Sequence, residues 1–281
     1  MNKEHKMTVG IVGLGLIGGS FARALKEFTD HRVLAYDIDA GAFLAAKLVG
    51  AVDGELDDQG LAECDVVIVS LYPEAAVEYI RSRERLFKEG SIVVDCGGTK
   101  RYVCEAVGSN SGRRFTFIGG HPMAGTQQWG FSHSRSTLFK GGSMILVPED
   151  GTDISVLEKA KKLFIELGFA DVVFTTAEEH DIRIAFTSQL PHVISNAYVK
   201  SPRAVDHRGF SAGSYRDLTR VSKLNVKLWT ELFLENGDNL ADEIELLSEN
   251  LLEYAKAIRE KDGEKLSALL TDGTESKKIA K

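Results

Sequence analysis

Cysteine is scarce in this sequence, and the patterns that would use it are missing. The 281 residues include three cysteines, Cys64, Cys96 and Cys104. They form no C-x-x-C pair and no metal-binding spacing with histidine. Neither a disulfide framework nor a metal site is therefore indicated. A protein of the reducing cytoplasm, without a metal, is the simplest interpretation.

Long hydrophobic runs and an excess of positive charge are missing as well. No run approaches the ~20 apolar residues of a membrane-spanning helix, and residues 1–7 lack the apolar segment of an export signal. A net charge of −7 argues against nucleic acid or an acidic membrane as the main partner. The apolar and charged fractions, 43% and 27%, are ordinary for a globular chain, and the length suits two domains, or one domain plus an extension.

A glycine-rich turn is the first motif that is present. Residues 8–12 form an apolar run, residues 13–20 read GLGLIGGS, and apolar residues follow at helical spacing from Ser20. In this context the first glycine permits a tight turn, the second lets a pyrophosphate approach the backbone, and the third lets the helix pack closely. The start of the helix would face the phosphates with unpaired N–H groups. The predicted cofactor-binding residues of this turn are Gly13, Gly15, Leu16, Ile17 and Gly18.

An acidic residue follows the second predicted strand, residues 33–36. Asp37 comes nineteen residues after Gly18, where a carboxylate accepts hydrogen bonds from both hydroxyls of an adenosine ribose. A carboxylate there repels a 2′-phosphate, and no basic residue follows in residues 38–40, so NAD is favoured over NADP. The alternative role, capping the next helix, fits Asp39 better than Asp37.

Further strand–helix units predict an α/β domain with a Rossmann-like parallel sheet. Apolar strands are expected at residues 65–70, 91–95, 115–118, 143–148 and 172–176, and helices at residues 73–87, 101–107 and 154–167. Strand ends at Ser70, at residues 97–100 and at His121 share the carboxyl edge of the sheet, where ligands of such folds bind. We expect this NAD-binding domain to span residues 1–177, with Ser70 among the cofactor contacts.

The segment Gly119–Gly125, GGHPMAG, surrounds one imidazole with small residues and a proline. That composition is typical of a chain that leaves a sheet and turns sharply beside a ligand, so we expect a loop. Histidine can exchange a proton near neutral pH. His121 is the candidate catalytic base.

The second half, residues 178–281, shows helical periodicity and no convincing strand. One long helix is expected over residues 178–199, kinked by Pro191. Ser188, His192 and Ser195 share one stripe of it. The stripe either lines a wet cleft or faces solvent, and we favour the cleft.

The remainder of the second half is expected to contain helices and a polar tail. Asp217 lies in a capping-box pattern that begins at Ser214, and Arg220 is a possible surface partner for it. Residues 240–258 carry apolar residues every three or four positions, a seam that can pair with another helix or subunit. We expect the tail after Gly273 to be disordered.

Four motifs occur in an order that resembles the prephenate/arogenate dehydrogenase family of tyrosine biosynthesis. They are GLGLIGGS at residues 13–20, GGHPMAG at 119–125, QLPH at 189–192 and RDLTR at 216–220. The glycine loop is shared with many dehydrogenases, whereas GGHPMAG followed by QLPH is specific. The resemblance spans residues 8–260.

The resemblance implies a chemistry and roles for particular residues. Family members oxidise a ring carbinol by hydride transfer to NAD(P) while the ring carboxylate leaves as CO2. By resemblance, His121 takes the hydroxyl proton, Arg220 holds a substrate carboxylate through its planar fork, and His192 lies near the substrate side chain. Trp229, which is otherwise most often a core residue, and Asp217 correspond to positions near the same pocket. His121 and Arg220 are therefore expected to meet across one crevice.

The sequence departs from the family pattern at one position. Where the family has a serine, in D-x-G-S-x-K, this chain has Gly98 within residues 95–100, DCGGTK. Either Thr99 supplies the hydroxyl, as a substrate-binding residue, or another group orients His121.

The alternatives remain open at this point. The resemblance implies prephenate dehydrogenase, with arogenate dehydrogenase as the alternative, and a homodimer built on the helical domain. β-Hydroxyacid dehydrogenases and imine reductases share the domain order, but the former use a lysine where this chain offers His192 and Arg220. A non-catalytic NAD-sensing regulator would have no use for His121 and Arg220 in one pocket.

Overall fold

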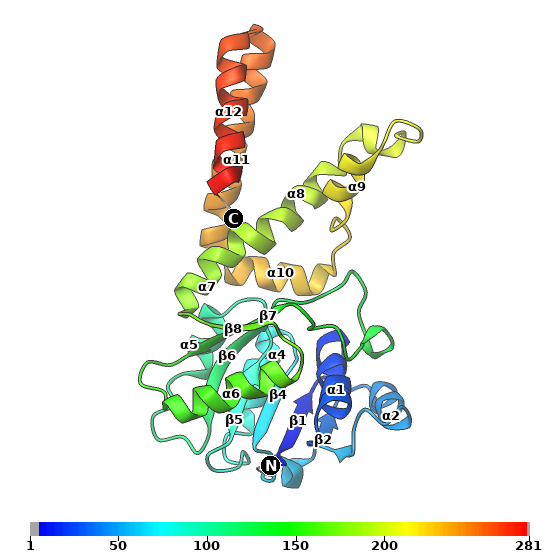
Figure 1. The fold of residues 1–281 in the computed structure, drawn as a ribbon, viewed down its shortest axis with the longest axis vertical. Coiled ribbons are helices and arrows are strands. Elements are labelled where there is room, and N and C mark those ends of the chain that lie inside the picture. The colour runs from blue at the N-terminus through cyan, green and yellow to red at the C-terminus, as the bar shows by residue number, and fades with distance from the viewer. Residues whose placement is uncertain (1–5, 280–281) are drawn as a thin grey trace.

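The computed structural model describes residues 6–279, and an eight-stranded sheet organises their first half (Figure 1). The order is β3-β2-β1-β4-β5-β6-β7-β8. Strands β1 to β6 run parallel to one another, β7 is antiparallel to β6, and β8 is parallel to β7. The strands are β1 (Thr8–Val12), β2 (Arg32–Tyr36), β3 (Gly54–Glu55), β4 (Val66–Val69), β5 (Ile92–Asp95), β6 (Thr116–Pro122), β7 (Ser143–Pro148) and β8 (Asp171–Phe174).

Helices cover both faces of this sheet because its central strands are apolar on both sides. One buried cluster joins the sheet to α1, α2 and α6, with Phe21 and Phe164 fully buried. A second cluster joins the other face to α3, α4 and α5, with Val77 and Val103 buried. The helices are α1 (Leu16–Phe28), α2 (Ala40–Leu48), α3 (Asp58–Leu61), α4 (Pro73–Ser82), α5 (Arg101–Val107) and α6 (Ile154–Glu166), and a short 3₁₀ helix, η1 (Phe131–His133), follows β6.

Helices alone form the second half of the described chain. In Figure 1, α11 and α12 form a hairpin that projects from the α/β body, α8 and α9 form a second arm, and α10 crosses the base between them. Within residues 6–279, no helix has the length and apolarity that crossing a bilayer requires. The helices are α7 (Ala177–Ile184), η2 (Ala185–Gln189), α8 (Leu190–Tyr198), η3 (Pro202–Val205), α9 (Gly213–Thr219), α10 (Val226–Glu235), α11 (Gly237–Glu260) and α12 (Gly263–Ile279).

Most strands expected from the sequence are confirmed to within two residues, but β6 is longer than expected. It continues through Gly119, Gly120, His121 and Pro122, which pair with β7, His121 opposite Ile145. The expectation that His121 lies in a loop is therefore wrong. The helix expected to reach residue 87 ends at Ser82.

The long helix expected over residues 178–199 is confirmed as an unbroken helical run of α7, η2 and α8, whose π-helical segment ends two residues before Pro191. Two other expectations about the helical half are wrong. No capping box forms, because α9 begins after Ala212 without a side-chain cap. The expectation of disorder after Gly273 is wrong for residues 274–279, which belong to α12; residues 280–281 lie outside the described part of the chain. The polar segment at residues 1–7 lies mostly outside the described residues.

Candidate active site

His121 is the penultimate residue of β6, and the two glycines before it allow close packing rather than a turn. A Cβ on Gly120 would lie 2.6 Å from Cγ1 of Val94, and one on Gly119 would lie 2.8 Å from Sγ of Cys104. Neither distance is tolerable for real side chains. The sheet therefore requires glycine at both positions to bring His121 to its carboxyl edge.

A buried ion pair holds the backbone that precedes His121. Lys100 and Asp95 are both fully buried and bonded to each other. The Lys100 ammonium also donates to the Gly120 carbonyl over 2.7 Å, and Asp95 Oδ1 accepts the Gly120 N–H over 2.9 Å. The loop after β5 is thereby fixed to β6 at the residue next to the imidazole. Buried pairs of this kind persist where additional hydrogen bonds satisfy the remaining donors and acceptors.

Three side chains form a hydrogen-bonded series that ends at His121. Nδ1 of His121 lies 2.9 Å from Nε2 of His180, and Nδ1 of His180 lies 2.6 Å from Oδ1 of Asp181. Asp181 also accepts the backbone N–H groups of Lys100 and Arg101, over 2.8 and 2.9 Å, at the start of α5. Helix α7 thus supplies the cap that α5 lacks and presents His180 to His121.

Burial and these contacts set the protonation of the series. Burial, the neighbouring His180 and the Lys100 ammonium lower the pKa of His121 well below its usual value. Burial also lowers the pKa of His180, although the bond to Asp181 opposes it. Burial alone would raise the pKa of the Asp181 carboxyl, but hydrogen bonds from His180 and from two backbone amides hold it below the usual value. The carboxylate is therefore charged and both imidazoles are neutral at pH 7.

Thr99 is fully buried, and its hydroxyl donates to Oε2 of Glu235 on α10. With its hydroxyl bonded to Glu235, Thr99 favours the alternative that another group orients His121, and its contact with the substrate stays a prediction. A Cβ on Gly98 would lie 3.2 Å from both methyl carbons of Leu232, which fills the place beside the glycine. His121 is oriented by His180 instead.

The contribution of the Thr99–Glu235 contact to stability depends on pH, because Glu235 is ionisable. Burial raises the pKa of Glu235 to about 7, against the opposing bond from Thr99. The folded state keeps the proton to about pH 7, while an unfolded glutamate releases it near pH 4.5. The stability contributed by the neutral form is therefore complete below about pH 4.5 and is lost as the pH rises to about 7.

Glu235→Gln is accordingly expected to gain stability relative to wild type as the pH increases. Glutamine stays neutral and can still accept the Thr99 hydrogen bond. Thermal unfolding should show the difference in Tm, variant minus wild type, growing by ~2 °C or more between about pH 5 and about pH 8. Glu249→Gln, at an exposed position on α11, should give a pH-independent difference over the same range. A constant difference for Glu235→Gln would contradict the raised pKa.

A second group of predicted residues surrounds His192. Its ring centroid lies 4.0 Å from that of Trp229, and its Nδ1–H donates to the Ser188 carbonyl over 2.7 Å. Burial lowers the pKa of His192, the bond to Ser188 opposes this, and the Arg220 charge adds to the lowering. Arg220 is itself exposed, directly after α9, and the amide of Gln127 donates to its carbonyl.

The polar stripe on α8 is not a solvated face. Gln189 is buried and donates to the carbonyl of Leu232 over 2.9 Å, and Asn196 donates to that of Ser222 over 3.0 Å. Ser195 is 1% exposed, and its hydroxyl has no partner within the described residues. These contacts argue against the solvent-facing alternative, while the cleft stays a prediction. Asp217 is exposed on α9 and caps nothing.

Helix α10 connects the two groups. It carries Trp229 at the His192 ring and Leu232 and Glu235 at the loop after β5, within six residues or ~9 Å of helix. Glu231 between them accepts the N–H of Glu74 at the start of α4 over 2.7 Å. The loop after β6 reaches Arg220 through Gln127. His121 and Arg220 thus belong to neighbouring clusters, while their meeting across one crevice stays a prediction.

The glycine loop has the geometry that a dinucleotide requires. Gly13 has φ +87°, and a Cβ there would lie 2.6 Å from the Ser70 carbonyl oxygen. A Cβ on Gly18 would collide with the Gly13 carbonyl, whereas one on Gly15 would meet nothing within 4 Å. Helix α1 begins beside that open space without a side-chain cap. Asp37 accepts the Leu14 N–H over 2.5 Å, at the end of β2.

Comparison with known proteins decides the family. The model of the prephenate dehydrogenase nucleotide-binding domain matches residues 21–173, and that of the prephenate dehydrogenase dimerization domain matches residues 176–272. The chain belongs to the prephenate dehydrogenase family. The expected fold class, a Rossmann-like domain followed by a helical domain, is confirmed.

Relatives of this family are similar along most of the chain. The prephenate dehydrogenase of Bacillus subtilis is 28% identical over 272 residues, covering 94% of this chain and 73% of its own length. The cyclohexadienyl dehydrogenase of Zymomonas mobilis is 31% identical, covering 92% and 90%. The structure of the Aquifex aeolicus prephenate dehydrogenase with hydroxyphenyl propionate and NAD+ has a TM-score of 0.87 at 28% identity and covers both chains fully.

Several residues of the site in this family member escape sequence reasoning. His180, Asp181 and Glu235 are separated from their partners by 59, 81 and 136 residues. The available sequence signal is the pair His180-Asp181 at the start of a helix, directly after the last strand. No group of three His, Cys, Asp or Glu side chains within residues 6–279 is placed to hold a metal ion.

Proposed function

We propose that this protein is an NAD-dependent prephenate dehydrogenase, which converts prephenate to 4-hydroxyphenylpyruvate and CO2. The observation that carries the proposal is the imidazole of His121, fixed at the carboxyl edge of a dinucleotide-binding sheet in a chain that matches both domains of the family. Its relatives are named as prephenate and cyclohexadienyl dehydrogenases. The Aquifex aeolicus structure contains NAD+.

The glycine loop, Asp37 and Ser70 are proposed to hold the cofactor. The open space at Gly15 and the uncapped start of α1 suit a pyrophosphate, and the Asp37 carboxylate suits the two ribose hydroxyls. Leu16 and Ile17 contribute backbone N–H groups in the first turn of α1. When bound, NAD accepts the hydride that leaves the substrate.

The remaining residues are proposed to bind and orient the substrate. His121 accepts the proton of the ring hydroxyl and returns it when the ring becomes aromatic. Arg220 binds a carboxylate of the substrate, and the His192–Trp229 pair forms the wall beside its side chain. Asp217, on the same helix end as Arg220, is proposed to lie near this pocket.

The direct test measures NADH formation with prephenate and with arogenate, side by side, and repeats both with NADP. Turnover of prephenate with NAD is the expected result. Preference for arogenate would establish the alternative substrate. NAD binding without turnover of either compound would indicate a regulator and overturn the proposal.

Arg220→Ala is expected to raise KM for prephenate by at least about tenfold, because losing one partner of a buried charge pair typically costs ~2–5 kcal/mol and the proposed substrate carboxylate would cover this guanidinium. Arg216→Ala, also exposed and on the same short helix, is the matched control and should leave KM within about twofold. Steady-state kinetics decide between the outcomes. An unchanged KM for Arg220→Ala would assign Arg220 to the surface.

Asp37→Ser is expected to shift cofactor preference toward NADP. Hydrogen bonds to charged groups are worth ~1.5–3 kcal/mol, so the NAD/NADP ratio of kcat/KM should fall by about tenfold or more. Asp39→Ser is the control, because serine can replace the Asp39 cap on α2 and should preserve the ratio. Equal ratios in both variants would contradict the ribose assignment.

We also propose the division of the chain at residue 177, a cytoplasmic location and a homodimer built on residues 178–281. The division is supported by the end of β8 at Phe174 and the start of α7 at Ala177. All three cysteines are free thiols, consistent with a reducing compartment.

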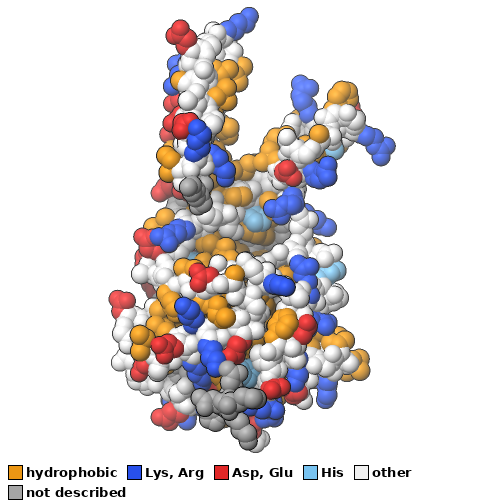
Figure 2. Space-filling model, in the orientation of Figure 1, with side chains coloured by type: hydrophobic (Ala, Val, Ile, Leu, Met, Phe, Trp, Pro, Cys, Tyr) orange, Lys and Arg blue, Asp and Glu red, His pale blue; other side chains and the backbone are white. Residues whose placement is uncertain are grey.

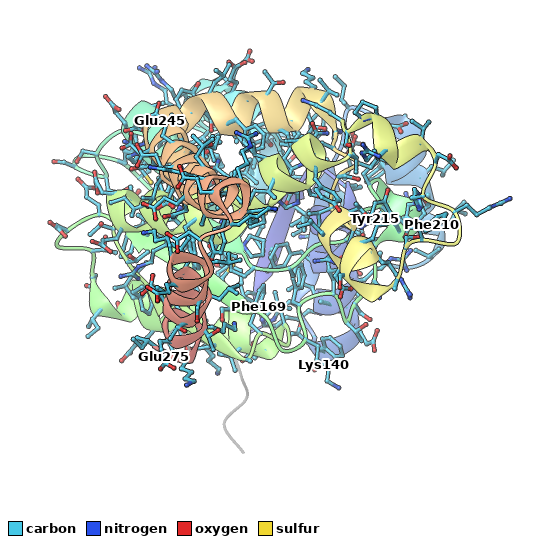
Figure 3. All side chains as sticks on the ribbon, turned by 90° about the horizontal axis from the view of Figure 1, so that it is seen from above. Lys140, Phe169, Phe210, Tyr215, Glu245 and Glu275 are labelled. Atoms are coloured by element: carbon cyan, nitrogen blue, oxygen red, sulfur yellow. The ribbon has the colours of Figure 1, made fainter. Side chains whose placement is uncertain are left out.

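Exposed apolar side chains and opposite charges support the dimer. Phe210 at the end of the arm is 94% exposed, and Leu252 on the hairpin 68%. Residues 199–227 contain seven Lys or Arg and two Asp, whereas residues 237–279 contain eleven acidic and six basic residues. Figure 2 shows the basic side chains gathered on the arm, and Figure 3 shows Tyr215 and Phe210 on it, away from Glu245 and Glu275 of the hairpin.

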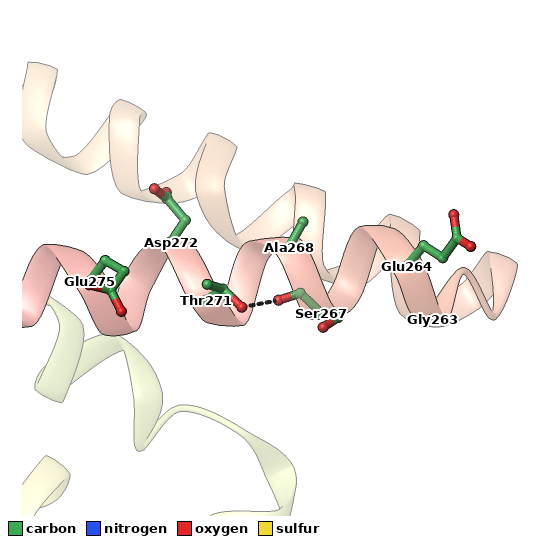
Figure 4. Close-up of a pocket in the computed structure, with 7 residues that line it drawn as sticks. All are labelled: Gly263, Glu264, Ser267, Ala268, Thr271, Asp272 and Glu275. Atoms are coloured by element: carbon green, nitrogen blue, oxygen red, sulfur yellow. Dashed lines mark hydrogen bonds between the residues drawn. The ribbon is translucent and has the colours of Figure 1, made fainter.

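One groove of the hairpin is also open. Gly263, Ser267, Ala268 and Thr271 line it on α12, with Glu264, Asp272 and Glu275 (Figure 4). It belongs to the hairpin and not to the site.

Sedimentation equilibrium should give twice the chain mass of 30.8 kDa, and a monomer at micromolar concentration would contradict the proposed dimer.

A further inference from the structure

The two hydrogen bonds of the series Asp181–His180–His121 run in the same direction, each imidazole donating toward Asp181. A carboxylate only accepts, so the proton between Asp181 and His180 resides on Nδ1 of His180. A neutral imidazole that carries its proton on Nδ1 has a lone pair on Nε2. Since Nε2 of His180 faces Nδ1 of His121 at 2.9 Å, His121 donates from Nδ1. Its own Nε2 then carries no proton.

The negative charge of Asp181, at the start of this series, is stabilised by its hydrogen-bond donors. Asp181 is 0% exposed, and its two oxygens receive the N–H groups of Lys100 and Arg101 at the start of α5. The guanidinium of Arg101 is 3.5 Å from Oδ2. Backbone amides and a positive helix end favour the ionised carboxyl. Protonation of Asp181, which would let the carboxyl donate and so reverse the direction of these hydrogen bonds, is therefore disfavoured at pH 7.

The polar side chains Thr99 and Lys100, in the loop after β5, are already bonded to groups other than His121. Gly98 has no side chain, and Leu232 packs against it. The hydroxyl of Thr99 is bonded to Glu235, and the Lys100 ammonium to Asp95 and the Gly120 carbonyl. Within the described residues, the His121 ring makes its hydrogen bond and its aromatic contact with His180.

We propose that His180 and Asp181 are positioning residues that lock His121 in the tautomer protonated on Nδ1, so that Nε2 is the atom that takes the substrate proton. The inference rests on the proposed function and deepens it. The O–H bond of the ring carbinol breaks and an N–H bond forms at Nε2 while hydride leaves the same carbon. The carbon–carboxylate bond then supplies its electron pair to the ring as CO2 departs. The proton returns to the oxygen, so no net proton is consumed.

The tautomer can be measured directly on the enzyme without substrate. Long-range ¹H–¹⁵N correlation of protein labelled at its seven histidines, assigned by the loss of one ring in His121→Asn, distinguishes the two nitrogens. The expected spectrum at pH 7 has a protonated Nδ1 and an unprotonated Nε2 for His121. A protonated Nε2 on His121 would overturn the inference, whatever the activity.

The kinetic arm uses His180→Phe, which keeps a buried ring and removes the acceptor. We expect kcat to fall by about 10² or more, KM for prephenate to stay within about threefold, and the Nε2–H tautomer of His121 to become populated. The matched control is His31→Phe, since His31 is buried before β2 at the opposite edge of the sheet; its kcat should stay within about twofold.

Unchanged kcat or an unchanged tautomer in His180→Phe would refute the role. If wild type turns over neither prephenate nor arogenate, the proposed function fails while the tautomer result stands. If His180→Phe does not fold, the wild-type spectrum alone decides.

Discussion

Replacing His121 by asparagine is expected to lower kcat by ~10² to 10⁴, the usual contribution of a general base. Asparagine lacks a group that can accept a proton near neutral pH, yet its amide is close in position to Nδ1 and can donate to His180. The strand pairing of β6 with β7 uses the backbone and is unaffected. The loss should therefore fall on kcat, with little change in stability.

NAD binding is the internal control for His121→Asn. The proposed cofactor residues lie in the loop after β1, at the start of α1, and directly after β2 and β4, away from His121 on β6. The dissociation constant for NAD, measured by calorimetric titration, should therefore stay within about twofold. His133→Asn, at an exposed histidine of η1, should retain wild-type kcat. A kcat for His121→Asn within about threefold of wild type would remove His121 from the chemistry.

The second large effect is expected on stability. Lys100→Met leaves the Asp95 carboxylate fully buried without its ammonium partner, and breaking a buried pair on one side costs ~3–5 kcal/mol. Urea unfolding should show the free energy of unfolding reduced by this amount. Lys26→Met, which breaks the partly exposed pair with Asp53, is the matched surface control and should cost no more than ~1 kcal/mol.

A double variant separates the buried charge from the packing. Lys100→Met with Asp95→Asn removes both charges, and the amide can still accept from the backbone N–H groups of Gly97 or Gly120. The double variant should therefore be more stable than Lys100→Met alone, by a coupling of ~1 kcal/mol or more. A double variant at least as unstable as the sum of the single variants would show that lost packing, not the unpaired charge, dominates.

Local patterns are sufficient to predict much of this fold. The strand–turn–helix at residues 8–28 needs only neighbours in sequence, and the structure gives Gly13 and Gly18 the steric reasons expected of them. The Asp39 cap on α2 is equally local and is confirmed.

Long-range contacts account for what the sequence does not reveal. Gly119 and Gly120 resemble a turn because glycine is usual in turns, but they are required by Cys104, Val94 and the Lys100–Asp95 pair, which come from other strands and helices. His180 meets His121 across 59 residues, and no spacing rule indicates that contact. The helix at the end of the chain is supported by packing against α11, with Tyr254 donating to the Leu269 carbonyl over 3.0 Å, and not by its polar composition.

The π-helical turn at Ala185–Gln189 accommodates one extra residue before the arm begins. Hydrogen bonds span four residues in an α-helix and five in a π-helix, so the extra residue changes the angular phase of α8 very little. The His192 ring therefore keeps the face that packs on Trp229. Deleting one of these five positions should leave a regular α-helix with the same side chains toward α10, whereas a deletion within α8 would rotate every later residue of that helix by ~100°.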